Sequence, residues 1–473
     1  MERERVMIET LGKRVGEEVK VCGWVDIRRD HGKLIFFDLR DASGKVQVVV
    51  TPSSRVGRAE AGGEVHAAAD RLRPEWVVKL VGEVNRRPDK MVNAGILNGD
   101  VEILAKSIEI LNEAETPSFD LAGDGREIGE ENRLVNRYLD LRRPRLQRNL
   151  RFRHRLIKHI RDYLDARGFV EVETPILTKS TPEGARDYLV PARLVPGSFY
   201  ALPQSPQQYK QLLMVAGLER YFQIARCFRD EDTRGDRQPE FTQLDLEMSF
   251  VTQEEVMALN EALLVELVTR LTPEKRIQQI PFPRLTYAEA MSKYQTDRPD
   301  LREDKNDPNL LAFGWVIDFP FFEKDKMGKW TFTHNPFSAP RPEHRPWLLK
   351  REKISAIETS QYDVVLNGFE IGGGSIRNHQ SEALRIVFEI LGYPKEQIEN
   401  DFGHMLRALA AGAPPHGGIA WGLDRLLAIL TGEPNIREVI AFPKTGEGRD
   451  LMMNAPAPAT FDQLQELKIK IER

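Results

Sequence analysis

Short apolar runs rich in β-branched and aromatic residues alternate with polar turns through the first 111 residues. They occupy positions 18–27, 33–39, 45–51, 76–85 and 100–111. Five short strands of this kind predict a small Greek-key barrel of the oligonucleotide-binding (OB) type, which stacks unpaired bases on exposed basic and aromatic side chains. The candidates for that role are Arg28, Arg29, Phe36 and Gln47. Aromatic residues in short strands also pack in cores, so the pattern alone leaves both roles open.

The pattern changes beyond residue 112. Residues 113–131 are rich in proline, glycine and acids and show no period, which indicates a linker. From Leu150 onward apolar residues follow helical spacing up to Gly168, and residues 169–174 form a predicted strand that ends at Pro175. Further helices are predicted at 253–271, 381–391 and 423–430, between strands. We therefore expect an α+β protein with a barrel domain (1–111), a hinge (112–145) and a catalytic domain (146–473).

Length and composition agree with a folded protein of two or three domains. The chain has 473 residues, 41% apolar and 30% charged. It contains no apolar run long enough to span a bilayer and no cleavable signal at Met1, so we expect a cytoplasmic protein without a membrane partner. Cys22 and Cys227 are far apart and lack metal-ligand spacing, so core thiols are expected rather than a disulfide or a zinc site.

Charge limits how the chain meets nucleic acid. The net charge of −4 argues against indiscriminate binding to polyanions, so any RNA contact must be local. One basic stretch exists: residues 133–161 hold eleven lysines and arginines against the single acid Asp140. This stretch is either an RNA contact or a solvated helix face.

The strongest chemical pattern lies in residues 220–250, which predict two strands around a charged loop. Period two places alternate residues of the second strand on a buried face (Leu244, Leu246, Met248, Phe250) and on a polar face (Gln243, Asp245, Glu247). In the first strand Arg229 and Glu231 share a face, and Arg234, Arg237 and Gln238 follow in the loop. Arginines above a sheet suit a nucleoside triphosphate. The alternative is a surface hairpin with exposed ion pairs, which needs no such clustering.

A second pattern lies in residues 362–379, where Asn367-Gly368 is the preferred two-residue turn of a hairpin. Pairing across this turn places Val365 opposite Glu370 and makes Asp363 and Glu370 diagonal neighbours on one face. Two such carboxylates repel each other unless a cation joins them, and Mg²⁺ bridging ATP phosphates is the natural candidate. The glycines at 372–374 would let a ligand approach the backbone, and Arg377 would anchor a substrate carboxylate.

A third pattern is a Gly-rich strand running into the apolar helix of residues 416–430. Arg425 lies in the first turn of this helix, where a cation opposes the helix dipole. Unless Asp424 merely compensates it, Arg425 is expected to contact a bound anion. The chain carries neither a P-loop nor a dinucleotide fingerprint.

Together these segments resemble the three signature motifs of class II aminoacyl-tRNA synthetases, in the right order and spacing. Within that class, TPEGARDYLVP (181–191), QSPQQYKQLL (204–213), RQPEFTQLD (237–245) and GFEIGGGSIR (368–377) resemble the bacterial aspartyl-tRNA synthetases. The resemblance covers essentially the whole chain. It implies an ATP-dependent ligase that forms aspartyl-adenylate and transfers the aspartate to tRNA(Asp), with a class II antiparallel sheet flanked by helices behind the N-terminal barrel.

The resemblance also implies roles for individual residues. The catalytic residues would be Arg229, Glu370 and Arg425. The aspartate-binding residues would be Glu183, Gln207, Lys210, Arg229, Asp245, His334 and Arg377. The ATP-binding residues would be Arg229, Asp230, Glu231, Gln238, Phe241, Glu370, Gly422, Leu423, Asp424 and Arg425. Asp363 and Glu370 would hold Mg²⁺, and Arg29, His31, Phe36 and Gln47 would contact the anticodon. Arg377 and Lys210 would grip the aspartate side chain, and asparagine would be rejected because its amide leaves both cations unpaired. The loop 181–187 would close over the substrate.

The sequence departs from the family in three places. Bacterial members usually carry a large inserted domain after the second motif, but a short polar stretch near residues 295–312 stands there. Asn335 replaces a second histidine found in many relatives. His31 is similar to the variant in members that charge both tRNA(Asp) and tRNA(Asn), which gives the hypothesis of dual charging.

Three alternatives remain at this stage. An asparaginyl- or lysyl-tRNA synthetase would share the fold, although Arg377 and Lys210 argue against both. A non-catalytic RNA-binding paralogue would not need the retained arginines and carboxylates. A tRNA-independent ligase that makes asparagine is disfavoured by the barrel. Since the helix ending at Gly168 and the strand to Pro175 form the subunit interface in relatives, a homodimer is expected.

Overall fold

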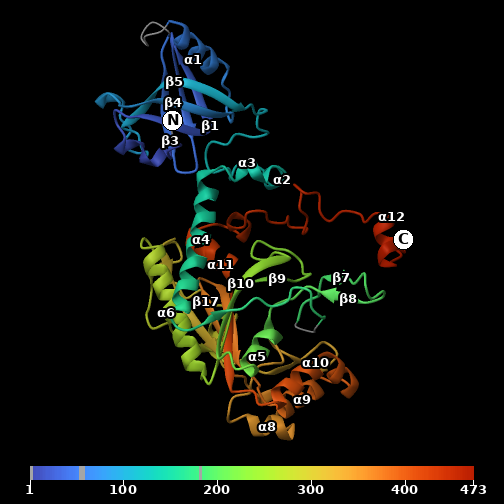
Figure 1. The fold of residues 1–473 in the computed structure, drawn as a ribbon. Coiled ribbons are helices and arrows are strands. Elements are labelled where there is room, and N and C mark those ends of the chain that lie inside the picture. The colour runs from blue at the N-terminus through green and yellow to red at the C-terminus, as the bar shows by residue number, and fades with distance from the viewer. Residues whose placement is uncertain (1–3, 53–58, 181–183, 473) are drawn as a thin grey trace. The chain divides into compact units, whose positions relative to one another are not determined.

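The computed structural model describes residues 4–52, 59–180 and 184–472, which fold into two compact units, Met1–Leu121 and Ala122–Arg473 (Figure 1). The expected hinge of residues 112–145 falls across this division, because everything from Ala122 onward packs with the second unit. Among the described residues no helix combines the length and the apolar character needed to cross a membrane.

The first unit is a closed five-stranded barrel with the strand order β1-β2-β3-β5-β4, as the sequence predicts. Inward positions such as Val21, Phe37 and Leu80 are fully buried, and alternate residues face outward. β1 continues past the predicted end at residue 27 and pairs with β2 as far as His31. The helix α1 was not predicted. The elements are η1 (Ile8–Lys13), β1 (Glu18–His31), β2 (Leu34–Arg40), β3 (Lys45–Val50), α1 (Ala59–Arg71), β4 (Val77–Arg86), η2 (Asp89–Met91) and β5 (Val101–Asn112).

The second unit is built on an eight-stranded sheet with the order β12-β14-β17-β18-β19-β10-β9-β6. The interior strand pairs are antiparallel, and only the edge pairs β12–β14 and β6–β9 are parallel. The strands of this sheet are β6 (Val170–Glu171), β9 (Arg220–Phe228), β10 (Glu240–Ser249), β12 (Arg284–Thr286), β14 (Phe313–Ile317), β17 (Gln361–Leu366), β18 (Phe369–Ile376) and β19 (His416–Gly422). Three two-stranded sheets pair β7 (Leu189–Pro191) with β8 (Phe199–Ala201), β11 (Arg276–Ile277) with β13 (Leu310–Leu311), and β15 (Phe322–Lys324) with β16 (Trp330–Phe332).

Helices cover both faces of this sheet (Figure 1). Leu244 and Leu246 of β10 pack in the main core with α4, α6 and α11, while α5 lies against β9 and β10. The cluster that joins α9 and α10 also takes up Leu212 of α5. The helices are α2 (Glu130–Val135), α3 (Arg137–Asp140), α4 (Pro144–Asp165), α5 (Gln207–Val215), α6 (Gln253–Leu271), α7 (Tyr287–Tyr294), α8 (Arg345–Lys350), η3 (Ile354–Ala356), α9 (Ser381–Ile390), α10 (Lys395–Ala410), α11 (Leu423–Thr431), η4 (Ile436–Val439) and α12 (Phe461–Leu467).

Two expectations about β10 need correction. Its polar positions are as buried as its apolar ones, because α5 covers the face that holds Asp245 and Glu247. Phe250 is not part of the buried face: it lies beyond the strand with a positive φ of 59° and is 66% exposed. The predicted strand at 169–174 shortens to the two residues of β6.

The basic stretch 133–161 is, in its first half, neither an RNA contact nor a solvated face. Arg133, Arg137, Arg143 and Arg145 are buried and bonded to acids and carbonyls of the second unit. Helical periodicity alone missed this, because Glu438 and Glu433, which accept from Arg133 and Arg145, follow about 300 residues later in the chain.

Candidate active site

A cavity of about 230 Å³ opens between the β9–β10 loop, β18 and the start of α11. Most of the residues that the resemblance implies for ATP meet here. The lining comprises Arg229, Glu231, Asp232, Thr233, Asp236, Arg237, Gln238, Phe241, Gln243, Glu370, Ile371, Gly372, Ala420, Gly422, Asp424, Arg425 and Ile436. We call this cavity the nucleotide pocket.

The three arginines that line the pocket differ in their ion pairs. Arg237 pairs with Glu231 at 3.4 Å, and Arg425 pairs with Asp236 at 3.2 Å and donates to the Glu370 carbonyl. Among the described residues Arg229 has no acidic partner; its guanidinium carbon lies 5.2 Å from the centre of the Phe241 ring, and its Nε is buried without an acceptor. Within the described part of the chain, Arg229 is therefore the pocket arginine whose guanidinium is not held in an ion pair.

The charge of Arg425 is not cancelled by its neighbour Asp424. The Asp424 carboxylate accepts the Thr242 backbone N–H at 2.9 Å and pairs with Arg153. Asp424 thus fastens α11 to β10 and α4. Arg425, one residue further in the first turn, is directed into the pocket, as expected for an arginine that contacts an anion.

The carboxylates of Asp363 and Glu370 converge above Gly373. The hairpin has the predicted register, with Val365 opposite Glu370, and its turn residues Asn367 and Gly368 both have positive φ. A Cβ placed on Gly373 would lie 2.7 Å from Asp363 Oδ1 and 3.3 Å from Glu370 Oε1.

Burial, followed by the nearby Glu370 charge, raises the pKa of the Asp363 carboxyl well above its usual range. A cation between these oxygens would remove that penalty, so the pair fits a metal that is completed by ligand oxygens.

Gly372 and Gly374 are needed for the packing of the sheet as much as for the approach of a ligand. A Cβ on Gly374 would lie 2.1 Å from the Gly418 carbonyl oxygen, and one on Gly372 would lie 2.7 Å from Trp421 Cδ1. Side chains here would therefore push β18 away from β19, which carries Ala420 and Gly422 of the pocket.

Next to the nucleotide pocket lies a buried cluster of two cations and two acids. Asp245 and Glu247 follow the pocket residue Gln243 on the same face of β10, at the two-residue repeat of a strand. Glu247 accepts two bonds from Arg377, at 2.8 and 3.1 Å. Lys210 of α5 pairs with Asp245 and lies 3.5 Å from Glu247. We call these four residues the charge cluster.

This pairing corrects the expected reason for rejecting asparagine. Arg377 and Lys210 do not wait unpaired for a substrate, since Glu247 and Asp245 already neutralise them. Burial would raise the pKa of Glu247, but the Arg377 and Lys210 charges outweigh it and lower that pKa. The cluster thus pairs two basic side chains with two acidic ones. Sequence reasoning placed Glu247 on the polar face but missed its role.

Two polar atoms have no partner in the described part of the chain, one in the cluster and one on α5, three residues before Lys210. Asp245 Oδ2 and Gln207 Nε2 are buried and have no hydrogen-bond partner among the described residues. One is an acceptor and the other a donor, the two types of group that an amino acid's ammonium and carboxylate need.

The remaining candidates are placed less centrally. His334 packs edge-on against Phe319, and burial lowers its pKa although the Glu370 charge opposes this. Asp230 lies outside the pocket lining, with its backbone N–H bonded to the Arg186 carbonyl, and the Leu423 side chain is in the hydrophobic core. Glu183, and with it the start of the loop 181–187, lies outside the described residues.

In the barrel, the register brings the anticodon candidates to one outward face. Arg29 is opposite Phe36, and His31 lies edge-on to Phe36 with ring centres 5.7 Å apart. Gln47 is opposite Asp38 on the next strand pair and bonds to Glu102 at 3.0 Å. Both arginines of this strand are held by acids, Arg29 by Asp38 and Arg28 by Asp30 and Asp70.

Sequence reasoning missed several lining residues. Asp232, Thr233 and Asp236 stand in the same charged loop as the predicted residues, so the loop's composition could have indicated them. Ile436 carries no such signal, because it reaches the pocket only through the packing of η4.

An OB barrel followed by an antiparallel sheet that holds a nucleotide pocket beside a charge cluster is the architecture of a class II aminoacyl-tRNA synthetase. Comparison with known families agrees. A profile described as tRNA synthetases class II (D, K and N) matches residues 129–446, and one described as OB-fold nucleic acid binding domain matches residues 19–111. The chain belongs to the class II tRNA synthetases of the D, K and N family.

Two curated relatives are similar over nearly their whole length. The chain is 44% identical to the aspartate–tRNA(Asp/Asn) ligase of Rubrobacter xylanophilus, with 98% of this chain and 96% of the relative covered. It is 40% identical to the enzyme of the same name from Desulfosudis oleivorans, with 100% and 98% covered. The first alignment has 587 positions against 473 residues here, a difference of 114, so that relative carries long segments that this chain lacks.

Solved structures show the same fold. The asparaginyl-tRNA synthetase of Pyrococcus horikoshii complexed with asparaginyl-adenylate superimposes with a TM-score of 0.74 at 24% identity, covering 93% of this chain and 98% of that one. A putative aspartyl-tRNA synthetase from Leishmania major also gives 0.74, at 20% identity, with 93% and 94% covered.

Proposed function

We propose that this chain is an aspartate–tRNA ligase, which activates L-aspartate with ATP and transfers it to tRNA. The observation that carries the proposal is the buried charge cluster, next along β10 to the nucleotide pocket. The names of the two curated relatives support it. A ligase of this kind works in the cytoplasm, where translation uses its product.

In the nucleotide pocket, Arg229 and Arg425 bind the ATP phosphates and Phe241 stacks on the adenine. Glu231 and Gln238 contact the nucleotide from the loop that links β9 and β10. Asp363 and Glu370 would hold Mg²⁺, which would neutralise phosphate charge when bound. The open guanidinium of Arg229 is suited to stabilise the charge that builds up on the α-phosphate during attack.

The open Asp245 oxygen of the charge cluster accepts from the aspartate ammonium, and Gln207 Nε2 donates to a carboxylate oxygen. Arg377 and Lys210 then turn their remaining N–H donors to the side-chain carboxylate. A guanidinium has five donors, and Glu247 and Ser375 take three of those of Arg377. Asparagine would place an NH₂ group against these donors, which disfavours it.

The reaction then runs in two steps without a covalent bond to the enzyme. An aspartate α-carboxylate oxygen attacks the α-phosphorus, and pyrophosphate leaves as aspartyl-adenylate forms. A hydroxyl of the terminal adenosine of tRNA attacks the aspartyl carbonyl, and AMP leaves as the ester forms. The residues of both sites act by holding the reactants in line and by compensating charge.

The barrel would bind the anticodon through Arg29, His31, Phe36 and Gln47, whose shared outward face supports stacking and base-edge contacts. We propose tRNA(Asp) as the main substrate and tRNA(Asn) as a second one, in line with the names of both relatives.

ATP–pyrophosphate exchange with aspartate, asparagine and lysine tests the proposal. We expect exchange with aspartate alone, and aspartyl transfer to both tRNA(Asp) and tRNA(Asn). Exchange with asparagine or lysine instead would overturn the assignment, and absence of exchange with all three would favour a non-catalytic RNA-binding protein. Transfer to tRNA(Asp) only would refute dual charging and leave the ligase intact.

We also propose a homodimer, supported by apolar side chains exposed near the predicted interface. They fall between residues 170 and 200, the part of the chain that follows the predicted interface helix, and exposed apolar side chains of this kind are often covered by a partner. Its members are Val170, Ile176, Leu177, Leu189, Leu194, Val195, Phe199 and Tyr200.

Light scattering at micromolar concentration should give twice the chain mass of 54.1 kDa. Leu194→Asp is expected to shift the protein towards the single-chain mass, whereas Met327→Asp, an equally exposed control, is not. A single-chain mass for the unaltered protein would contradict the dimer.

A further inference from the structure

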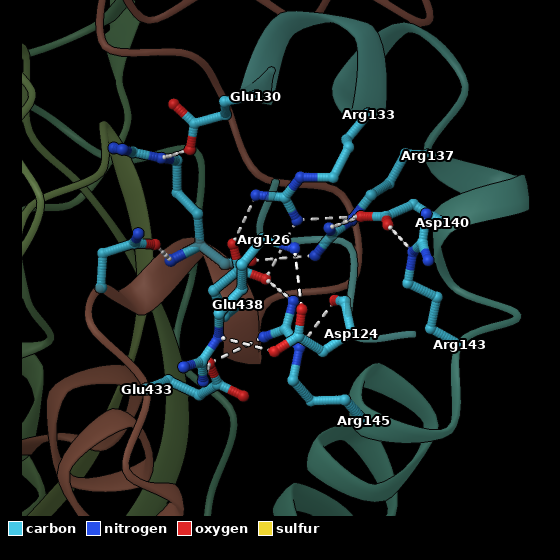
Figure 2. A network of polar contacts seen from close by, with 12 residues as sticks. Asp124, Arg126, Glu130, Arg133, Arg137, Asp140, Arg143, Arg145, Glu433 and Glu438 are labelled. Atoms are coloured by element: carbon cyan, nitrogen blue, oxygen red, sulfur yellow. Dashed lines mark hydrogen bonds and ion pairs between the residues drawn. The ribbon is translucent and has the colours of Figure 1, made fainter. Parts of the chain in front are cut away.

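A buried network of arginines and acids fastens the segment 433–441 to the beginning of the second unit (Figure 2). Glu438 accepts from Arg133 and from Arg145, each at 2.9 Å. Glu433 accepts from Arg145 at 2.7 Å and from Asn149 at 2.7 Å. The carboxylates of Glu433 and Glu438 are almost fully buried.

The backbone of the segment is held as well. Arg137 donates to three of its carbonyls, those of Arg437, Ile440 and Ala441, at 2.9 to 3.0 Å. Asp140 fixes the Arg137 guanidinium from the other side at 2.7 Å and also accepts from Arg143. The segment is thus fixed by directional bonds along its length.

Such a network needs a reason beyond stability. Burying charges costs desolvation energy, and apolar residues of similar volume often stabilise a fold as well or better. What ion pairs with planar guanidinium groups add is a defined position, since each bond has a required direction. The part of the chain that these bonds position is segment 433–441.

On its other side, segment 433–441 lies against the nucleotide pocket. Ile436 lines the pocket, and its N–H donates to the Gly235 carbonyl in the β9–β10 loop at 3.1 Å. Just after the segment, the Lys444 N–H donates to Gln238 Oε1 at 2.7 Å, and Gln238 Nε2 returns a bond to the Lys444 carbonyl at 3.2 Å. The loop that carries Asp236 and Gln238 therefore rests on residues 435–444.

We propose that Glu438, with Arg133 and Arg145, is a positioning residue for ATP binding: the network holds segment 433–441, which holds the β9–β10 loop in the shape that binds ATP. The inference rests on the proposed function for the identity of the nucleotide. Neither Glu438 nor its arginine partners line the pocket, so their effect passes through the segment.

The protonation behaviour of Glu438 agrees with this geometry. Burial would raise its pKa, but the hydrogen bonds and charges of Arg133 and Arg145 outweigh burial and lower the pKa to about 2. A lowered pKa means that the ionised form stabilises the fold above the ordinary value near 4.5 and loses this effect as the pH falls towards 2. Glu438 is therefore ionised at neutral pH.

The test compares Glu438→Gln, which keeps the shape and removes the charge, with Leu406→Ala as a control. Leu406 is buried in the cluster of α9 and α10, away from the nucleotide pocket, so its variant lowers stability without touching segment 433–441. We expect Glu438→Gln to raise the KM for ATP in aspartate-dependent exchange about tenfold. Its KM for aspartate and its kcat should stay within about twofold. Leu406→Ala should lower the unfolding temperature and leave the KM for ATP unchanged.

Glu438→Asp, which restores the charge, should recover most of the ATP affinity. An unchanged KM for ATP in a folded Glu438→Gln protein, or an equal rise in Leu406→Ala, would overturn the positioning role. Calorimetric titration with ATP gives the same comparison without turnover. If the unaltered protein shows no exchange and binds no ATP, the proposed function is wrong. If the unaltered protein and Glu438→Gln bind ATP equally well, only the positioning role of the network is wrong.

Discussion

Replacing Arg377 by leucine is expected to lower kcat/KM for aspartate activation by about a thousandfold, which corresponds to about 4 kcal/mol of lost transition-state stabilisation. The reason is the position of Arg377 in the charge cluster, where it is buried and bonded to Glu247 through two nitrogens. Leucine removes the donors that would meet the aspartate side chain. It also takes away the two bonds that Glu247 accepts from Arg377 and leaves Lys210, at 3.5 Å, as the remaining cation beside this buried carboxylate, which then repels a substrate of the same sign more strongly.

ATP–pyrophosphate exchange at varied aspartate concentration measures this effect. Because the loss of the Arg377 bonds to the buried Glu247 would also destabilise the fold, the double variant Arg377→Leu with Glu247→Gln serves as the control. It removes the repulsion, so it should fold like the unaltered protein and still fail to activate aspartate. Full activity in either folded variant would show that the amino-acid site lies elsewhere.

Replacing Arg229 by glutamine is expected to lower kcat for aspartate activation by about a hundred- to a thousandfold, the usual effect of removing one transition-state donor. Arg229 lines the nucleotide pocket and has no acidic partner among the described residues. Its loss therefore leaves no unpaired carboxylate behind. The unfolding temperature should stay close to that of the unaltered protein, so the loss of rate can be assigned to chemistry.

Single-turnover formation of aspartyl-adenylate is the suitable measurement, since it separates chemistry from product release. The matched control is Arg226→Gln, three residues earlier on β9, where the arginine is exposed and pairs with Glu240. Arg226 does not line the pocket, and its variant should keep the rate within about twofold. An equal loss in both variants, or none in Arg229→Gln, would remove Arg229 from the reaction.

Much of the fold and of the site followed from local patterns. The five barrel strands and helix α6 appear within a few residues of their predicted bounds, and Thr252 with Glu255 forms the capping box that begins α6. The Asn367-Gly368 turn determined the register that brings Asp363 and Glu370 together. These features depend on residues close in the chain, where turn chemistry and side-chain period act.

For other features the sequence showed the charged residues but not the residues that they pair with. Sequence reasoning named Arg377 and Lys210 but left them unpaired, because their acids stand on another strand, Glu247 being 130 residues away from Arg377. The basic stretch 133–161 appeared as a charged surface, while Arg133 binds Glu438 across 305 residues. Ile436 of the nucleotide pocket carried no sign of its place.

The sequence by itself therefore determined which residue types gather in each strand, turn and helix, and through the motifs it determined the family. The tertiary structure alone decided which charges neutralise one another and which segment supports the nucleotide pocket. The physical reason is range. Backbone periodicity and turn preferences act over a few residues. An ion pair between distant segments forms only once these segments have been packed side by side. The same arginine is therefore solvated on the surface or buried in an ion pair, depending on where the fold places its acidic partner.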